Sequence, residues 1–81
     1  MTSAKKLFMD IGYREETASK TSRSYTKKIG PAKDTIVVDI GYPGGFAAAY
    51  RVIGGKRSYN GMTGAELRAA VRAMEEMEAR K

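Results

Sequence analysis

The side chains of this chain that could carry chemistry are cations interspersed along the sequence with tyrosines. Cations bind phosphates and aromatic rings stack on unpaired bases, so this mixture is typical of proteins that bind RNA or single strands. The same residues also have a structural use, because tyrosines fill half-buried sheet positions and lysines protect sheet edges from aggregation. Both interpretations stay open. The candidate contact residues are Lys27, Lys28, Arg51, Lys56, Arg57 and Tyr59.

The net charge lies in the middle of the chain. The 81 residues include 15 Lys/Arg and 9 Asp/Glu, which gives a net charge of +6. Positive and negative side chains balance within residues 1–16 and within residues 63–81, so residues 17–62 carry the whole excess. A charge confined to one stretch indicates a surface that meets something negative, such as nucleic acid or an acidic protein face.

Catalytic groups are scarce in the sequence. It has no cysteine and no histidine, which removes thiolate chemistry, the commonest general base and the commonest zinc ligand. A phosphate-binding loop is also excluded, because Gly55-Lys56 is followed by Arg57 and Tyr50 stands where the motif needs its first glycine. The carboxylates follow no nuclease-like or two-metal pattern and are expected on the surface. We therefore expect no enzyme, no catalytic residue, no metal and no cofactor.

Residues 56–62 form a cationic segment with a tyrosine, directly before a predicted helix. The N-terminus of a helix attracts anions through its free N–H groups and its dipole. This segment is a candidate loop for contact with phosphate or acidic side chains, and the alternative is an ordinary surface connection.

The hydrophobic patterns predict one α+β domain over residues 1–81. Apolar residues at helical spacing predict a short helix over 3–11, and a Thr63–Glu66 capping box opens a long helix over 63–80. Alternating segments bounded by turn residues predict strands over 13–17, 23–29, 35–42 and 46–53. The expected architecture is a four-stranded antiparallel meander, or a three-stranded one, with both helices on one face and the other face toward solvent.

The same patterns predict which side chains share a face. In the strand over 46–53, the residues on one face are Phe46, Ala48, Tyr50 and Val52, while Ala47 and Ala49 are small enough for another element or a partner to lie close. In the long helix, the predicted buried stripe is Leu67, Ala70, Val71, Met74 and Met77.

Neither targeting nor membrane insertion is indicated. The only apolar run near the start, residues 7–9, is too short for a secretory signal, and no 18-residue apolar stretch occurs. We expect a cytoplasmic protein with no membrane partner.

Three short segments, Leu7-Phe8, Ile11-Gly12-Tyr13 and Thr63-x-x-Glu66-Leu67-x-Ala69, occur in a fixed order around the expected meander. In this layout the chain resembles small proteins carried by phages and other mobile elements. Some of those proteins are anti-CRISPR inhibitors, which occupy a surface of the nuclease complex. The resemblance implies a phage or mobile-element accessory protein that binds a host protein or ribonucleoprotein complex stoichiometrically, within the host cytoplasm.

The helix–sheet–helix order is also similar to double-stranded-RNA-binding folds, although Gly64-Ala65-Glu66 stands where those domains place lysines. Three functions are therefore carried forward. The first is stoichiometric inhibition of a host complex, the second is direct binding of RNA or DNA, and the third is a small homodimeric structural module.

Overall fold

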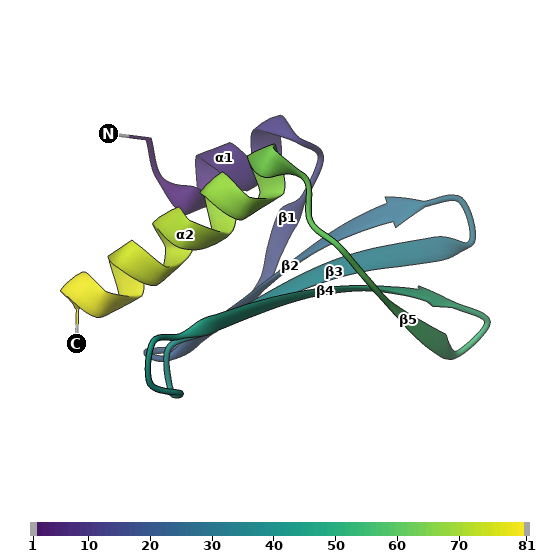
Figure 1. Cartoon of the computed structure of the whole chain (residues 1–81). Coiled ribbons are helices and arrows are strands. Elements are labelled where there is room, and N and C mark those ends of the chain that lie inside the picture. Colours follow the sequence, from purple (N-terminus) through teal and green to yellow (C-terminus); the bar gives the residue numbers. More distant parts are fainter. Residues whose placement is uncertain (1, 81) are drawn as a thin grey trace.

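The computed structural model describes residues 2–80. Two helices and five strands follow one another as α1 Ala4–Asp10, β1 Arg14–Ala18, β2 Ser22–Ile29, β3 Ala32–Asp39, β4 Phe46–Ile53, β5 Lys56–Asn60 and α2 Gly64–Ala79. The strands form one antiparallel sheet in chain order, and both helices lie on one side of it (Figure 1). The predicted α+β class and meander are confirmed. The predicted number of strands is wrong, because the sheet has a fifth.

The missed strand, β5, follows a turn that was expected to end the sheet. Gly54 and Gly55 have φ angles of +56° and +80°. Positive φ at both central residues is what the type I′ two-residue hairpin turn requires, so the chain reverses and pairs Lys56 with Ile53. Residues 56–60 are therefore an edge strand, so the prediction of a loop is wrong for these residues, and their contact with a ligand stays a prediction.

The strand β3 begins three residues earlier than predicted. The strands predicted over 23–29 and 35–42 left Gly30, Pro31 and the residues up to Asp34 as a connecting loop. Instead Gly30 and Pro31 form a tight turn in which Gly30 has a φ of +57°, and Ala32 pairs directly with Ile29. The extension places Lys33 and Asp34 within the sheet, where strand alternation sends their side chains to opposite faces.

Both helices begin at side-chain caps. The Ser3 hydroxyl accepts a hydrogen bond from the Lys6 N–H at 3.2 Å at the start of α1. At the start of α2 the Thr63 hydroxyl accepts from the Glu66 N–H at 3.2 Å, and the Glu66 carboxylate accepts from the Thr63 N–H at 2.8 Å. The predicted capping box is confirmed.

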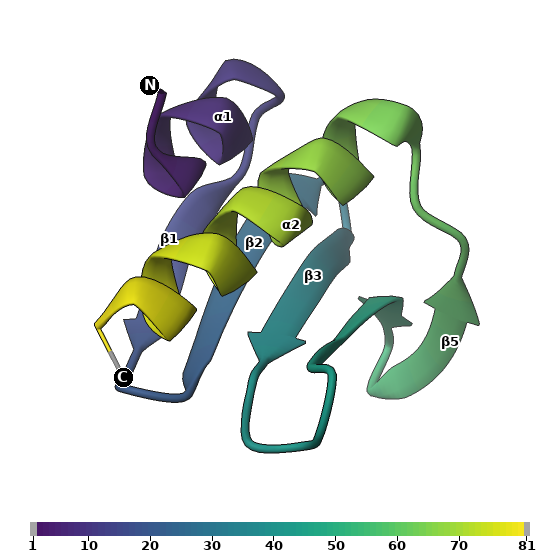
Figure 2. The same cartoon turned by 60° about the vertical axis from the view of Figure 1, so that its left-hand side comes forward.

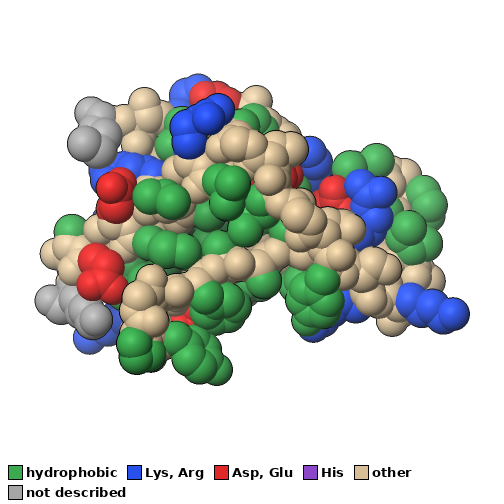
Figure 3. Space-filling model, viewed as in Figure 1, with side chains coloured by type: hydrophobic (Ala, Val, Ile, Leu, Met, Phe, Trp, Pro, Cys, Tyr) green, Lys and Arg blue, Asp and Glu red, His purple; other side chains and the backbone are tan. Residues whose placement is uncertain are grey.

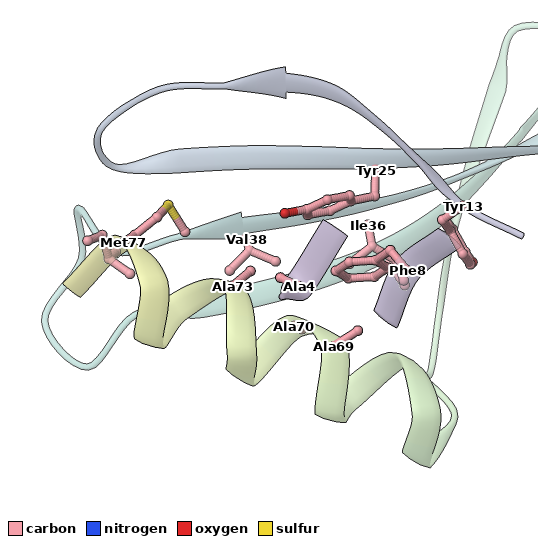
Figure 4. Close-up of a cluster of buried hydrophobic side chains, with 12 residues drawn as sticks. Ala4, Phe8, Tyr13, Tyr25, Ile36, Val38, Ala69, Ala70, Ala73 and Met77 are labelled. Carbon is pink, nitrogen blue, oxygen red and sulfur yellow. The ribbon is translucent and has the colours of Figure 1, made fainter. Parts of the chain in front are cut away.

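The core lies between the helices and the sheet, and stacked rings form its centre (Figure 4). Phe8 of α1 stacks on Tyr25 of β2 with ring centroids 3.9 Å apart, and Tyr13 meets Phe8 edge-on at 5.8 Å. Ile36 and Val38 of β3 are completely buried beside them. This packing positions α1 over the sheet even though a helix of seven residues is too short to be stable alone.

The long helix α2 buries alanines rather than the predicted stripe. Its buried residues are Ala69, Ala70, Ala73 and Met77, whereas Leu67 and Val71 are about half exposed. Small side chains allow the helix to approach α1 and β3 closely, which turns the larger Leu67 and Val71 toward solvent. The prediction is right for Ala70 and Met77 and wrong for Leu67 and Val71.

One carboxylate, that of Glu76, joins three elements. It accepts hydrogen bonds from the Arg23 guanidinium of β2 at 2.6 Å and from the Ala4 N–H of α1 at 3.0 Å. Burial alone would raise the pKa of Glu76, but these two hydrogen bonds and the charge of Arg23 outweigh it and hold the pKa below its usual range. The pair is well shielded, with side-chain exposures of 9% for Arg23 and 15% for Glu76.

Candidate nucleic-acid interface

The two faces of the sheet carry different side chains. Successive residues of a strand point to opposite faces, and paired residues of neighbouring strands point the same way. The helix face therefore carries the side chains in register with Tyr25, Ile36 and Ala49, which are buried under the helices. We call the other side the open face. Its residues include Arg14, Thr26, Lys28, Lys33, Thr35, Val37, Phe46, Ala48, Tyr50, Val52, Arg57 and Tyr59.

A row of hydroxyl-bearing side chains crosses four strands of the open face. Thr26, Thr35, Tyr50 and Tyr59 are direct cross-strand partners, and we call them the tyrosine row. The two threonines are buried by their neighbours, whereas Tyr59 is 68% exposed. The rings of Tyr50 and Tyr59 are tilted by 60° with centroids 5.8 Å apart, so the row ends in two adjacent aromatic surfaces.

A second row carries cations and lies two residues away from the tyrosine row on each of the four strands, later in β2 and β4 and earlier in β3 and β5. Lys28 lies opposite Lys33, Lys33 opposite Val52, and Val52 opposite Arg57, and we call these four residues the cation row. Two residues along a strand correspond to about 7 Å, so the cation row runs beside the tyrosine row. Arg57 connects the two, because its guanidinium lies 4.2 Å from the centroid of the Tyr50 ring.

One cation of the row is paired within the described part of the chain, and the other two are not. Its ion pair is that of Lys33 with Glu16 at 3.0 Å, and no carboxylate of residues 2–80 forms an ion pair with Lys28 or Arg57. Like charges directly opposite each other on neighbouring strands destabilise a sheet. Lys28 and Lys33 are such a pair, and the ion pair of Lys33 with Glu16 offsets part of their repulsion.

The six candidate contact residues are divided between the two faces. Lys28, Arg57 and Tyr59 lie together on the open face, and Lys27, Arg51 and Lys56 lie on the helix face. The structure thus brings only half of the candidates into one surface.

Two of the helix-face candidates have partners within the fold. The Arg51 guanidinium donates to both oxygens of Asp34 at 2.7 and 3.1 Å, and these hydrogen bonds are the main reason that the pKa of Asp34 is below its usual range. The Lys27 ammonium lies 4.7 Å from the centroid of the Tyr13 ring. Lys56 is exposed near the tip of the β4–β5 hairpin.

The tyrosines are divided in the same way. Tyr13 and Tyr25 belong to the core, and Tyr13 donates a hydrogen bond to Glu66 at 2.8 Å. Burial and this acceptor raise the pKa of Tyr13 far above its ordinary value. Tyr50 and Tyr59 lie on the open face. The structural interpretation therefore holds for Tyr13 and Tyr25, and the ligand-binding interpretation of Tyr50 and Tyr59 stays a prediction.

Lys33 and Tyr50 were missing from the candidate contacts. Lys33 was placed in a loop, and its position in the cation row follows only once β3 is extended to Ala32. The available signal was the length of the turn, because Gly30-Pro31 alone closes a two-residue hairpin. For Tyr50 the signal was its alternation with Phe46, Ala48 and Val52, which correctly placed all four on one face.

The N-terminus of α2 is not an anion site, because its cap is made from within the chain. Thr63 and Glu66 satisfy each other's N–H groups, and the Glu66 carboxylate adds negative charge at the position where an anion would bind. This helix end is therefore capped by the chain's own side chains.

Other kinds of site are not found in the described residues 2–80. No three potential ligands among their acidic, histidine or cysteine side chains come together in a way that could hold a metal ion. Neither of the two helices is long and apolar enough to cross a membrane.

Comparisons of the chain with protein-family models, with curated proteins and with solved structures find no match in any of the three.

Proposed function

We propose that this protein is a non-enzymatic binding protein that holds single-stranded nucleic acid on its open face. The observation that carries the proposal is the adjacency of the tyrosine row and the cation row, defined above, on the one sheet face that no helix covers. Proteins that bind single strands combine exposed rings, on which bases stack, with cations that follow the phosphates.

The arrangement favours single strands over duplexes. A ring can stack only on a base whose face is free, and the bases of a duplex are stacked on one another. Tyr59 exposes most of its surface and Tyr50 lies beside it, whereas the cations lie in the neighbouring row. A strand laid across the sheet can place its phosphates over Lys28, Lys33 and Arg57 and its bases over the two rings.

In this function the protein acts by stoichiometric binding, and its contact surface meets nucleic acid. The strand can be free or can be the exposed part of a host ribonucleoprotein complex. Three expectations stay predictions. The first is that the chain is a phage or mobile-element accessory protein, the second is that it inhibits a host complex such as a CRISPR nuclease, and the third is that it forms a homodimeric module.

The proposal is tested by fluorescence anisotropy with a labelled oligonucleotide of about twelve nucleotides, as RNA, as DNA and as the matching duplexes, over a series of salt concentrations. Three neutralised phosphates give a slope of log K against log salt of about −2 for a single strand, so affinity falls roughly twentyfold between 50 and 200 mM salt. We expect binding to the single strands to be tighter than to the duplexes.

Two variants with equal loss of charge make the test specific. The open-face variant combines Lys28→Gln, Lys33→Gln and Arg57→Gln, and it should lose most of the affinity and flatten the salt slope by about 2. The control variant combines Lys5→Gln, Lys20→Gln and Lys56→Gln, three exposed lysines outside the open face. Equal losses of affinity in the two variants would mean that net charge alone drives binding, and would refute a defined site. Absence of any binding by the native chain at low salt would refute the proposed function.

A further inference from the structure

A second pair of exposed rings lies on the open face, at the opposite end of β4. Tyr42 and Phe46 meet edge-on, with centroids 5.4 Å apart and an interplanar angle of 79°. They are 65% and 40% exposed, although large apolar side chains of this kind are usually buried. Phe46 lies four residues before Tyr50 in β4, so strand alternation points both side chains to the same face.

The loop before β4 holds Tyr42 in place. The Asp39 carboxylate accepts a hydrogen bond from the Gly41 N–H at 2.6 Å, and the Tyr42 carbonyl accepts one from the Gly45 N–H at 2.9 Å. Gly44 and Gly45 have φ angles of +81° and +71°, which a side chain would disfavour. The ring is thus presented by a hydrogen-bonded loop, and its only ring partner among the described residues is Phe46.

Small side chains separate the two ring pairs. Ala48 lies between Phe46 and Tyr50 on the same face of β4, and its cross-strand partner is Val37. In the space-filling view, hydrophobic side chains project from the helix-free side in two groups with a hollow between them (Figure 3). The four residue steps from Phe46 to Tyr50 span about 13 Å, which corresponds to about four nucleotide steps at the stacked rise of 3.4 Å.

The charges differ between the two ends of this hollow. Lys28, Lys33 and Arg57 lie beyond Tyr50 and Tyr59, whereas Asp39 lies beside Phe46. A carboxylate repels phosphate, so this end of the open face can attract the bases of a strand but not its backbone. The two ends therefore suit different parts of the same ligand.

From this arrangement we infer that Tyr42 and Phe46 form a second base-stacking site on the open face, so that the protein binds a single strand long enough to reach both ring pairs. The inference rests on the proposed function and adds a minimum length to it. A strand must cover at least about five nucleotides to contact both sites, because the ring pairs are about four stacked nucleotides apart.

The test measures affinity against length, with unlabelled single-stranded oligothymidylates of two to twelve nucleotides competing for a labelled twelve-nucleotide strand. For the native chain we expect affinity to rise in two steps, the second when the strand reaches about five nucleotides. A double variant, Tyr42→Ser with Phe46→Thr, should lose the second step, with affinity for the ten-nucleotide strand reduced about five- to hundredfold and affinity for three nucleotides unchanged. The matched control, Leu67→Ala with Val71→Ala, removes two exposed apolar side chains from α2 and should keep both steps.

The possible results separate the inference from the function on which it rests. A double variant that binds every length as the native chain does overturns the second site and leaves the proposed function standing. A double variant that loses affinity equally at all lengths also overturns it, since the two ring pairs would then not be independent. Failure of the native chain to bind any length would remove the proposed function itself. The single variant Tyr42→Ser changes only a loop side chain, so it should lose part of the second step even if the Phe46 substitution disturbs folding.

Discussion

The two faces of the sheet use the same residue types for different purposes. On the helix face, Arg23 and Arg51 are each paired with a carboxylate, Glu76 and Asp34 respectively. On the open face, Lys28 faces another lysine across the sheet and Arg57 lies on a tyrosine ring. The arginines of the helix face hold the fold together through ion pairs, whereas Lys28 and Arg57 of the open face have no carboxylate partner among residues 2–80.

This difference shows that net charge and charge position along the chain do not identify a binding surface. Lys27 and Lys28 are neighbours in sequence and point to opposite sides of β2. One lies over the ring of Tyr13 and the other joins the cation row. What decides the role of each is the parity of its position in a strand, together with which face the helices cover (Figure 2).

The largest effect should come from breaking the ion pair of the helix face. Glu76→Gln leaves the shielded Arg23 without a charged partner, and removal of one partner of a buried pair typically costs about 3 kcal/mol or more. The free energy of unfolding, measured by urea denaturation followed by circular dichroism, should fall by about this amount. Affinity for single strands, measured under conditions where the variant is folded, should not change. A loss of affinity in the folded variant would mean that the two faces are not separate in function.

Acid should lower the free energy of unfolding through the paired carboxylates of the helix face, those of Glu76 and Asp34. The pKa values of Glu76 and Asp34 are lower in the folded chain than in the unfolded one, so the unfolded state takes up protons first as the pH falls. Their stabilisation is complete above about pH 5, the upper end of carboxylate titration, and is lost as the pH falls through the folded pKa values. Urea denaturation at a series of pH values should show this decline, and Glu76→Gln should make it shallower. If the free energy of unfolding instead rises toward acid pH, these carboxylates do not stabilise the fold in their charged form.

Truncation of one exposed ring should weaken binding without affecting the fold. Tyr59→Ala removes a base-stacking surface, which is worth about 1–3 kcal/mol of binding free energy. Because Tyr59 is mostly exposed, the free energy of unfolding should change by no more than about 0.5 kcal/mol. Tyr59→Phe keeps the ring and serves as the control in both assays. If Tyr59→Ala binds as tightly as the native chain, the tyrosine row is not a contact surface.

The smallest effect on stability should have the opposite sign. Lys28→Glu places a carboxylate directly opposite Lys33 and replaces a repulsive cross-strand pair with an attractive one, although Lys33 already pairs with Glu16 and the gain is therefore small. The free energy of unfolding should rise by about 0.2–1 kcal/mol while affinity for single strands falls. The same change at Lys20, in the turn between β1 and β2, provides a charge-matched control. A variant that becomes less stable would mean that the two lysines do not repel each other in the folded chain.

The sequence predicted most of the elements because periodicity and capping are local properties. The apolar alternation of residues 36–40 and 46–52 and the Thr63–Glu66 box each lie within one segment. They correctly predicted β4, α2 and the existence of β3, although β3 begins and ends three residues earlier than predicted. The strand β5 was missed because its five residues are all exposed and show no apolar alternation. Its place in the sheet comes from the Gly54-Gly55 turn and from pairing with β4.

The composition of the site was less accessible to sequence reasoning. Arg51 and Lys27 could not be separated from Arg57 and Lys28 without the register of the sheet, which depends on the lengths of two turns. The stripe of α2 was wrong at Leu67 and Val71 because apolar character predicts burial only where another element covers the residue. The side of α2 that packs against the rest of the fold is instead the one with the small residues Ala69, Ala70 and Ala73.

The claim that the open face binds the ligand can be tested most directly with the methyl groups of two adjacent alanines. Ala47 points to the helix face of β4 and Ala48 to the open face. In a methyl NMR titration with a single-stranded oligonucleotide, the resonances of Ala48 and Val52 should shift with saturation, while those of Ala47 and Leu67 should stay in place. Shifts confined to Ala47 and Leu67, with Ala48 and Val52 unchanged, would place the ligand on the helix side and contradict the account.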